Sequence, residues 1–347
     1  MSISNSTLLA RNTSADPGGG LAIGGATRRL LVALPALNEE RTVGDVVRAV
    51  PAEVPGIDAI DVLVIDDGSQ DRTGTEAAAA GATVVHHGLQ RGVGAAFHTA
   101  LAYGLDHGAD ILVTIDSDGQ FDPRDIPRLI EPVVAGRADF ATASRFLDEA
   151  LLPDMPAVKI WGNRMMSRLI SSLAGKRFYD VSCGMRCYSR RAMLQLHLLA
   201  RFTYTQEVIL NLSFKDLRIE EVPIRVRGER EFGESRVASS LWRYALRTVQ
   251  IIFRCYRDYH PLRFFGGLAL MLLVPAVALA AFLGWKYLET GAFSPFKWAG
   301  ALALTLTAGA GVLLHVGIIG DMLNRHRIYL EEILFRQRSE SGKGPSP

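Results

Sequence analysis

Cysteine is scarce in this chain, and its placement excludes a disulfide framework. Of 347 residues only three are cysteine, at Cys183, Cys187 and Cys255. The count is odd, and none of the spacings matches the paired cysteines of a zinc finger. Isolated cysteines of this kind are typical of proteins in a reducing compartment. The sequence therefore does not indicate a secreted, disulfide-stabilised domain.

A large excess of one charge is also missing, and so is an apolar N-terminal segment. The formal net charge is +2, which indicates neither a polyanion-binding protein nor an acidic tail, so we expect no nucleic-acid partner. Residues 1–28 are rich in Ser, Gly, Ala and Thr and contain no apolar run long enough for a signal peptide. We predict that this segment is disordered.

Short apolar runs alternate with helical patterns from residue 29 to about residue 146. The strand-like runs are Leu30–Leu34, Val62–Ile65, Thr83–His86, Ile111–Ile115 and Phe140–Ala143. The helical patterns between them are Glu39–Val50, Thr73–Ala80, Val93–His107 and Pro123–Ala135. Strands separated by crossover helices predict an α/β fold with a doubly wound, mostly parallel sheet.

Residues 157–230 continue the pattern and are expected to complete the same domain. Helices are predicted at Ile160–Leu173 and Thr205–Phe214, and a strand at Glu220–Val226. Between the two helices we expect a turn region that contains Gly and Cys.

Acidic residues follow two of the predicted strands at their carboxyl ends. Asp66 and Asp67 follow one strand, and Asp116 and Asp118 follow another. Parallel strands end along one edge of a sheet, so both pairs should face one crevice, where open α/β sheets bind ligands. Two carboxylates one residue apart, together with an amide oxygen such as that of Gln120, can hold a hard divalent cation. The pattern predicts a nucleotide-diphosphate site.

Each of these polar residues also has a purely structural interpretation. Asn38 or Glu39 could cap a helix, and Asp66 and Asp67 could belong to turns. The ordered combination with Asp116 and Asp118 favours function. His86 and His87 are interpreted as loop residues.

Two segments near the C-terminus have the length and composition of membrane spans. Phe264–Trp285 and Trp298–Gly320 contain no Asp, Glu, Lys or Arg, and their length suits a bilayer better than a buried core helix. Arginines flank the pair on both sides, at Arg254, Arg257, Arg263, Arg325 and Arg327. The positive-inside rule then predicts a multi-pass membrane protein whose flanks and catalytic domain are cytoplasmic.

The segment before the first span combines arginines with apolar residues at helical spacing. Residues 237–263 therefore predict an amphipathic juxtamembrane helix at the membrane interface, although a soluble helix packed on the domain shows the same pattern. Residues 321–347 are interpreted as a cytoplasmic C-terminal tail. The small residues Ala308–Gly311 would allow close helix packing, and the sequence leaves a homo-oligomer open.

Three motifs, in this order, resemble family 2 glycosyltransferases with the GT-A fold. They are Pro35–Glu39, Val64–Thr73 and Asp116–Gln120, and the resemblance covers residues 29–236. It is greatest to dolichyl- and polyprenyl-phosphate sugar synthases, including the subgroup with two C-terminal spans. The resemblance divides the chain into a GT-A domain at 29–236, the juxtamembrane helix at 237–263, two spans at 264–320 and the tail.

The resemblance assigns roles to particular residues. Those that would line the base and ribose pocket are Pro35, Leu37, Glu39, Ile65 and Asp67. Asp116, Ser117 and Asp118 would meet the ribose and diphosphate, and Asp118 and Gln120 would bind Mg²⁺ or Mn²⁺.

Arginines would supply the remaining contacts to phosphate. Arg145 matches a phosphate-contacting arginine of the family, and Arg230 and Arg236 match a basic loop that closes over the donor and acceptor. The segment Asp180–Arg186 resembles the family's acceptor segment, and Gln206 and Glu207 match a pair near the sugar, without a defined role.

The implied activity is inverting transfer of one sugar from a nucleotide-sugar donor to a polyprenyl-phosphate acceptor at the cytoplasmic membrane face. Asp116, Asp118, Arg145, Arg230 and Arg236 would carry the catalysis. The Gln-x-x-Arg-Trp signature of processive synthases is absent, which favours one sugar per turnover. Two alternatives stay open: transfer to a lipid hydroxyl, and a non-catalytic membrane scaffold with the same fold.

Overall fold

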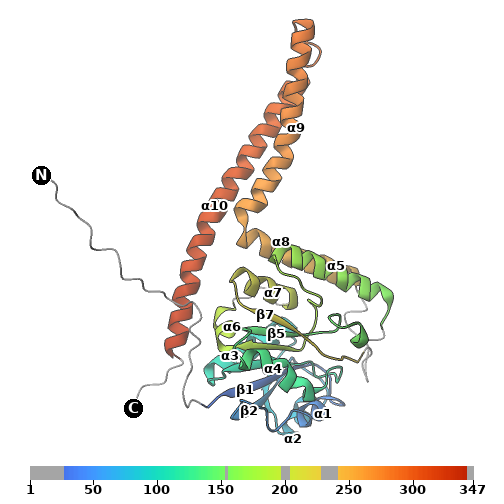
Figure 1. Ribbon diagram of the computed structural model, residues 1–347, viewed down its shortest axis with the longest axis vertical. Helices are drawn as coiled ribbons and strands as arrows, with labels where there is room; N and C mark the ends of the chain where they lie inside the picture. Colours follow the sequence, from blue (N-terminus) through green and yellow to red (C-terminus); the bar gives the residue numbers. More distant parts are fainter. Residues whose placement is uncertain (1–26, 153–154, 197–203, 228–240, 342–347) are drawn as a thin grey trace, which may run out of the picture.

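A seven-stranded sheet organises the N-terminal part of the chain (Figure 1). The computed structural model describes residues 27–152, 155–196, 204–227 and 241–341. The strands are β1 Arg29–Ala36, β2 Ala59–Asp66, β3 Thr83–His86, β4 Ile111–Thr114, β5 Phe140–Ser144, β6 Arg186–Ser189 and β7 Ile219–Pro223. Their spatial order is β3-β2-β1-β4-β6-β5-β7. The predicted α/β class and mostly parallel sheet are confirmed.

One strand, β6, runs against its neighbours and was not predicted. It pairs antiparallel with β4 and β5, whereas β1 pairs parallel with both β2 and β4. The turn region predicted between the two helices is wrong for Arg186–Ser189, which form a strand. The strand has only four residues, Arg-Cys-Tyr-Ser, and shows neither alternation nor an apolar run. Its position is decided by the two strands between which it lies.

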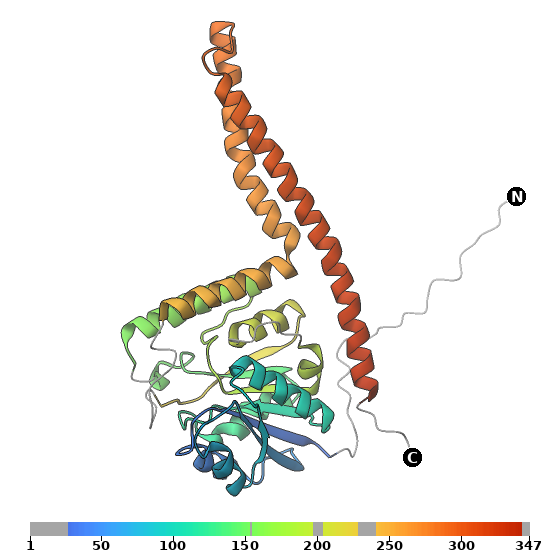
Figure 2. The ribbon, with the colours of Figure 1, turned by 180° about the vertical axis from the view of Figure 1, so that it is seen from behind.

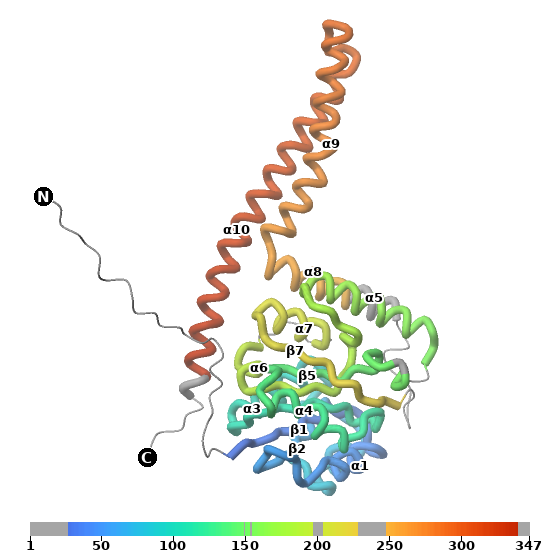
Figure 3. The backbone as a smooth tube through the Cα atoms, in the orientation of Figure 1, coloured from blue at the N-terminus to red at the C-terminus, as the bar shows by residue number. Residues whose placement is uncertain are grey.

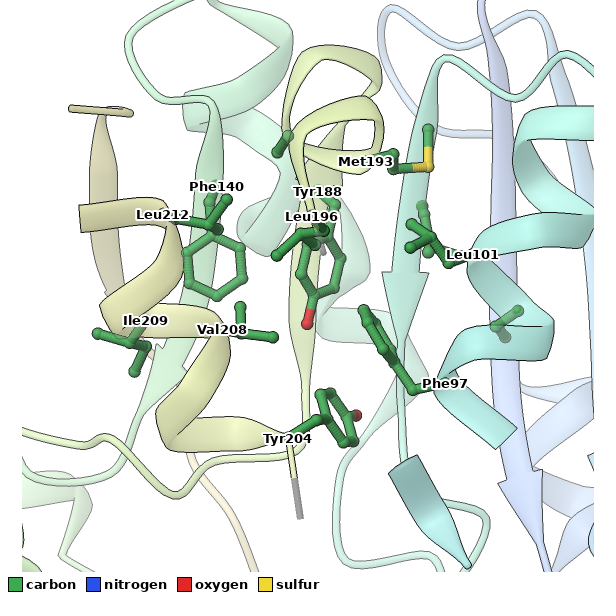
Figure 4. Close-up of a cluster of buried hydrophobic side chains, with 14 of the residues drawn as sticks. Phe97, Leu101, Phe140, Tyr188, Met193, Leu196, Tyr204, Val208, Ile209 and Leu212 are labelled. Atoms are coloured by element: carbon green, nitrogen blue, oxygen red, sulfur yellow. The ribbon is translucent and has the colours of Figure 1, made fainter. Parts of the chain in front are cut away.

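Helices cover both faces of the sheet. Those of the sheet domain are α1 Val43–Arg48, α2 Thr73–Ala79, α3 Val93–Asp106, α4 Ile126–Val134, α5 Ala157–Ala174, α6 Arg190–Gln195 and α7 Thr205–Phe214. One face packs against α3 and α7, where Phe97, Phe140, Tyr188 and Tyr204 form an aromatic cluster (Figure 4). Residues of α1 and α4 pack on the other face. Strands buried on both faces explain the continuous apolar runs of the sequence.

Three helices follow the sheet domain at the C-terminal end of the chain. They are α8 Leu241–Tyr259, α9 Pro261–Thr290 and α10 Lys297–Ser341. The helices α9 and α10 form an antiparallel hairpin that projects from the domain (Figure 2). Only 11% and 17% of their most apolar stretches are buried, so both are candidate membrane spans.

Small residues hold the hairpin together. Ala299, Ala303 and Ala310 of α10 are buried against α9, and a Cβ on Gly309 would lie 3.3 Å from Leu272. Such residues let two helix backbones approach closely where lipid supplies no hydrophobic driving force. The glycine-rich stretch thus serves a contact within the chain.

The helix α10 continues well past the apolar stretch. Its 45 residues correspond to about 68 Å, more than twice the thickness of a bilayer core. The C-terminal part of α10 lies beside the sheet domain (Figure 3). Glu331 forms an ion pair at 2.9 Å with Lys215, the residue that follows α7, and the Arg327 guanidinium lies 3.8 Å from the centre of the Tyr259 ring. Much of the segment interpreted as a tail is therefore a helix docked on the domain.

The buried centre of the sheet should dominate stability. Leu112 in β4 is fully buried, and we expect Leu112→Ala to lower the free energy of unfolding by about 2–5 kcal/mol because it leaves a cavity. Leu89 is 80% exposed and serves as the control, with an expected change below about 0.5 kcal/mol for Leu89→Ala. Denaturant unfolding in detergent measures both, and equal effects would contradict the assigned core.

Candidate active site

The acidic residues predicted at strand ends lie at one edge of the sheet. β2, β1 and β4 are consecutive neighbours, so their carboxyl ends meet. Hydrogen bonds join the loops: the Ser117 hydroxyl donates to the Pro35 carbonyl at 2.9 Å, and the Thr42 hydroxyl donates to the Ser117 carbonyl at 2.8 Å. The expectation of a common edge is confirmed, and the individual ligand roles stay predictions.

Asp67 organises the loop that leads into α3. One oxygen of its buried carboxylate accepts the Arg91 N–H at 2.9 Å and pairs with His87 Nδ1 at 2.8 Å. The other accepts the Gly92 N–H at 2.8 Å. The second ring nitrogen of His87 pairs with the Thr99 hydroxyl at 2.9 Å. Asp67 therefore shapes the wall of the predicted base pocket through these bonds.

His87 is buried and is a residue whose importance the sequence analysis missed. His87 lies in the loop after β3, as interpreted, and its buried ring also connects Asp67 to α3. The sequence contained a signal, because Asp66-Asp67 and His86-His87 both stand at the carboxyl end of a strand-like run. In the structure β2 and β3 pair with Asp66 opposite His86, so Asp67 and His87, which follow them, also meet. Two acidic residues facing two histidines across parallel strands predict such pairs.

Asp66 stabilises the turn after β2. Its carboxylate accepts the Ser69 N–H at 2.9 Å and pairs with His86 Nδ1 at 3.0 Å. Burial raises the pKa of Asp66, but hydrogen bonds from Ser69 and the contacts with His86 outweigh this and hold it below its usual range. Gly68 in this turn has a φ of +83°, a conformation that side chains disfavour. These contacts agree with the interpretation of Asp66 as a turn residue.

The first and second loops interlock beside this turn. The Glu39 N–H donates to the Thr73 hydroxyl at 2.8 Å, and the Asn38 side-chain oxygen accepts the Gln70 N–H at 2.9 Å. The segment Pro35–Glu39 is therefore held against the loop that follows β2. Leu37 and Ile65, the other predicted pocket residues, belong to this same edge.

Asp118 and Gln120 offer a set of oxygen atoms that suits a divalent cation. The buried Asp118 carboxylate accepts the Gln120 N–H at 3.0 Å, which fixes the loop between them. The Gln120 amide nitrogen donates to the Arg227 carbonyl at 3.3 Å, and no hydrogen bond from the described residues reaches its side-chain oxygen, which could therefore bind a ligand. Among the described residues there is no cluster of three or more His, Cys, Asp and Glu suited to a metal. The residues fit a cation whose shell is completed by diphosphate oxygens and water.

A cavity of about 780 Å³ opens beside Gln120. Its charged lining comprises Arg41, Asp45, Asp122, Arg124, Asp125, Arg225 and Arg227. Of the predicted site residues that the structure describes, its lining contains only Gln120, so the cavity lies to one side of the predicted base pocket. The volume is within the range of small-molecule sites. The acidic residues predicted to take part in the reaction lie at the strand ends and not in the lining of this cavity.

Arg145 is held rigidly by a buried carboxylate. Its Nε and Nη2 donate to the two oxygens of Asp180 at 2.6 and 2.9 Å, and Nη2 also donates to the Ser182 hydroxyl at 2.8 Å. Glu221 supports Asp180 by accepting its backbone N–H at 2.8 Å. Nη1 forms no hydrogen bond with the described residues, so that edge of the guanidinium is available to an anion.

The charge of Asp180 depends on this arginine. Complete burial raises the pKa of Asp180, but the charge and hydrogen bonds of Arg145 outweigh it and hold the pKa below its usual range. Asp180 therefore positions Arg145 and does not resemble a free general base.

Gly184 allows the backbone that leads into β6 to approach Asp116. A Cβ at this position would overlap the Asp116 carboxylate. The Gly184 carbonyl accepts a hydrogen bond from the Thr114 hydroxyl at 3.0 Å, which fixes the close approach. This contact brings the segment that contains Asp180 to the same edge as Asp116.

Arg186 is fully buried, whereas an arginine that binds a ligand at the surface would be exposed. It donates to the carbonyls of Cys183 at 2.8 Å, Val181 at 3.2 Å and Thr205 at 2.8 Å. These bonds connect the segment between α5 and β6 to the start of α7, where Glu207 is also buried. The predicted Arg230 and Arg236 lie outside the described residues.

Comparison with known proteins gives consistent matches. The family model described as "Glycosyl transferase family 2" matches residues 31–196. The polyprenol monophosphomannose synthase of Mycolicibacterium smegmatis is 31% identical over 234 residues, covering 63% of this chain and 85% of that protein. The undecaprenyl-phosphate mannosyltransferase of Micrococcus luteus is 30% identical over 229 residues, covering 61% of this chain and 89% of that protein.

A solved structure shares the fold. Glucosyl-3-phosphoglycerate synthase from Mycobacterium tuberculosis, in complex with Mn²⁺, uridine diphosphate and phosphoglyceric acid, gives a TM-score of 0.53 at 22% identity. The match covers 66% of this chain and 78% of that structure. At this level of identity the likeness concerns the fold alone.

The close approach at Gly184 should be essential for ligand binding. We expect Gly184→Ala to weaken binding of a nucleoside diphosphate at least about tenfold, because the new methyl group displaces Asp116. Gly162→Ala is the matched control, since a Cβ there meets nothing within 4 Å. Calorimetric titration measures both, and unchanged binding in Gly184→Ala would contradict the placement of Asp116.

Removing the negative charge of Asp180 should destabilise the domain. We expect Asp180→Asn to cost about 3–5 kcal/mol because it leaves Arg145 without its buried counter-ion. Asp61→Asn breaks the exposed pair with Arg29 and should cost no more than about 1 kcal/mol. Chemical denaturation measures both variants.

The same pair predicts a dependence on pH. Because the native pKa of Asp180 is lowered, its stabilisation is complete above the ordinary value of 3.8 and is lost as the pH falls through the native value. Asp180→Asn should therefore flatten the loss of stability in acid. An unchanged acid profile would show that other carboxylates determine it.

Proposed function

Because this chain belongs to glycosyltransferase family 2, we propose that it transfers one sugar from a nucleotide-diphosphate sugar to a polyprenyl phosphate. The relatives named above transfer sugars to such lipid phosphates, as their names state. The observation that carries the proposal is the meeting of acidic strand ends in a chain with two candidate membrane helices. The donor would be of the GDP-mannose or UDP-glucose type.

The donor diphosphate would bind across the carboxyl ends of β1, β2 and β4. Asp116, Ser117 and Asp118 follow the central β4, and Ser117 is bonded to the end of β1. Asp118 and Gln120 would hold Mg²⁺ or Mn²⁺, which would neutralise charge that develops on the departing diphosphate. Pro35, Leu37, Glu39 and Ile65 would form the base and ribose pocket, whose wall Asp67 fixes.

Arg145 would present its Nη1 edge to a phosphate. Its other edge is committed to Asp180 and Ser182, so little entropy is lost when the guanidinium binds an anion. A positive charge that is fixed in position stabilises the charge of the transition state most in a site from which water is excluded. Arg230 and Arg236 would add two further cationic contacts to the phosphates.

The acceptor chemistry requires no strong general base. A phosphate monoester is largely ionised near neutral pH, so its oxygen can attack the anomeric carbon directly. One displacement breaks the bond to the nucleoside diphosphate and forms the sugar–phosphate bond, with inversion of configuration. Asp180, the nearest buried carboxylate to Arg145, is already ion-paired, and a phosphate acceptor therefore suits the site better than a hydroxyl.

The membrane would bring the apolar acceptor to the site. We propose that α9 and α10 cross the bilayer and that the catalytic domain and α8 lie on the cytoplasmic side. Arg254, Arg257 and Arg263 precede or begin the first crossing and Arg325 and Arg327 follow the second, as expected for a cytoplasmic flank. The division into 29–236, 237–263, 264–320 and 321–347 belongs to the same proposal.

The metal-binding pair supplies a direct test of the reaction. In detergent or nanodiscs with a nucleotide sugar, undecaprenyl phosphate and Mg²⁺ or Mn²⁺, we expect Asp118→Asn to lower kcat/KM at least about 100-fold, because charge on the leaving group is no longer balanced. Glu76→Gln is the control, since Glu76 lies on α2 in an ion pair with Arg72. Radiolabelled sugar in the lipid fraction measures turnover.

The acceptor panel separates the alternatives. Retained turnover in Asp118→Asn or in the presence of a chelator would contradict the proposed site. Transfer to diacylglycerol or ceramide with none to lipid phosphate would replace the acceptor. A wild-type chain that binds no nucleoside diphosphate would favour the non-catalytic scaffold.

A further inference from the structure

A mostly buried ion pair joins α10 to the end of α7, and the proposed reaction gives it no role. Glu331 lies about 16 Å along the helix axis beyond Gly320, the last residue of the second apolar segment. Its Oε2 is 2.9 Å from Nζ of Lys215, and the side chains of Lys215 and Glu331 are 13% and 18% exposed. The pair therefore forms where the C-terminal part of α10 lies beside the sheet domain (Figure 3).

The burial of this pair indicates a role in orientation more than in stability. Burial lowers the pKa of Lys215, and the hydrogen bond and charge of Glu331 offset this only in part. The ammonium group also donates to the Gln195 carbonyl at the end of α6. A buried ion pair adds little net stability, and the best-attested use of such a pair is to fix the register of the segments that it joins.

Tyr259, at the end of α8, supplies a second contact between α7 and α10. Its hydroxyl accepts a hydrogen bond from Asn211 Nδ2 of α7 at 2.7 Å, and its carbonyl accepts one from Asn324 Nδ2 of α10 at 3.1 Å. The Arg327 guanidinium lies over the Tyr259 ring, and its Nε is 3.6 Å from Glu331 Oε1. The ion pair and the Tyr259 contacts therefore belong to one cluster.

The helix α7 is packed tightly enough to transmit a displacement from one end to the other. Residues 206–213 are all buried. Val208 and Leu212 belong to one cluster with Phe140 of β5 and Tyr188 of β6 (Figure 4). Close-packed interiors have low compressibility and transmit strain. The end of α7 that contacts α10 therefore constrains the position of the other end.

That other end of α7 holds the segment that leads into β6. The Thr205 carbonyl accepts a hydrogen bond from Arg186 Nη1 at 2.8 Å. The same guanidinium donates to the carbonyls of Val181 and Cys183, which directly follow Asp180 in this segment. The position of α7 therefore bears on Asp180, the carboxylate that orients the arginine of the candidate site.

We propose that Lys215 and Glu331 are positioning residues, through which α10 sets the position of α7 and of the predicted acceptor segment Asp180–Arg186. The inference rests on the proposed function, because it concerns transfer to a lipid phosphate. The predicted base pocket belongs to β1 and β2, whereas α7 packs beside β5 and β6, at the other end of the sheet. Loss of the ion pair should therefore reduce turnover and leave donor binding unchanged.

Charge exchange tests the pair in the full chain, in nanodiscs with a nucleotide sugar, undecaprenyl phosphate and Mg²⁺. We expect Glu331→Lys to lower kcat about fivefold or more, because like charges then separate α10 from α7. Calorimetric binding of the nucleoside diphosphate should stay within about twofold of the wild-type value. The double variant Glu331→Lys with Lys215→Glu restores opposite charges, keeps the net charge beside Arg327 and should recover most of the lost turnover.

The matched control is the neighbouring carboxylate on the same helix. Glu332 forms an exposed pair with Arg336, and we expect Glu332→Lys to leave turnover unchanged. A milder variant, Glu331→Gln, removes one charge without adding another and should lower turnover less than Glu331→Lys.

Three results would overturn the inference. They are unchanged turnover in both Glu331 variants, no recovery in the charge-exchanged double variant, and a loss of donor affinity equal to the loss of turnover, which would indicate general damage to the fold.

Amide hydrogen exchange separates failure of the inference from failure of the proposed function. We expect amides of Thr205–Phe214 to exchange faster in Glu331→Lys and to regain protection in the double variant, since the ion pair restrains α7. A wild-type chain without turnover would refute the proposed function, and the exchange rates would then still decide whether α10 positions α7. Equal exchange in wild type and Glu331→Lys would contradict the positioning role.

Discussion

The need to satisfy buried charge at the carboxyl edge of the sheet governs the rest of the molecule. Asp66, Asp67, Asp118 and Asp180 are all buried, and a carboxylate without partners in such a place is costly. Their partners are backbone N–H groups of loops, two histidines and Arg145. The bonds that stabilise these charges are therefore the bonds that shape the pocket and orient its arginine, so stability and function share one network.

The C-terminal helices connect the domain to the candidate membrane spans. The hairpin of α9 and α10 supplies candidate spans, and the lower part of α10 returns to the domain through Glu331 and Lys215. Tyr259, at the end of α8, also contacts Arg327 of α10. Domain and hairpin are thus joined at several points, which limits how the site can be tilted relative to a lipid acceptor.

Much of the architecture could be predicted because its signals are local. The five strands from β1 to β5 were found from apolar runs, since a strand buried on both faces needs apolar residues throughout. β6 was missed because its four residues, including the buried Arg186, acquire their burial and partners only between β4 and β5. His87 was missed for a related reason: its partner Asp67 is twenty residues away.

Sequence alone determined the class of the fold, the edge at which acidic residues gather and the two long apolar helices. These three features follow from periodicity, strand direction and composition, which can be read from residues that are close together in the sequence. Tertiary structure decided that Asp180 holds Arg145, that Gly184 must lack a side chain beside Asp116 and that α10 docks at the end of α7. Each of these depends on contacts between distant segments, whose distances and exposure no local pattern encodes.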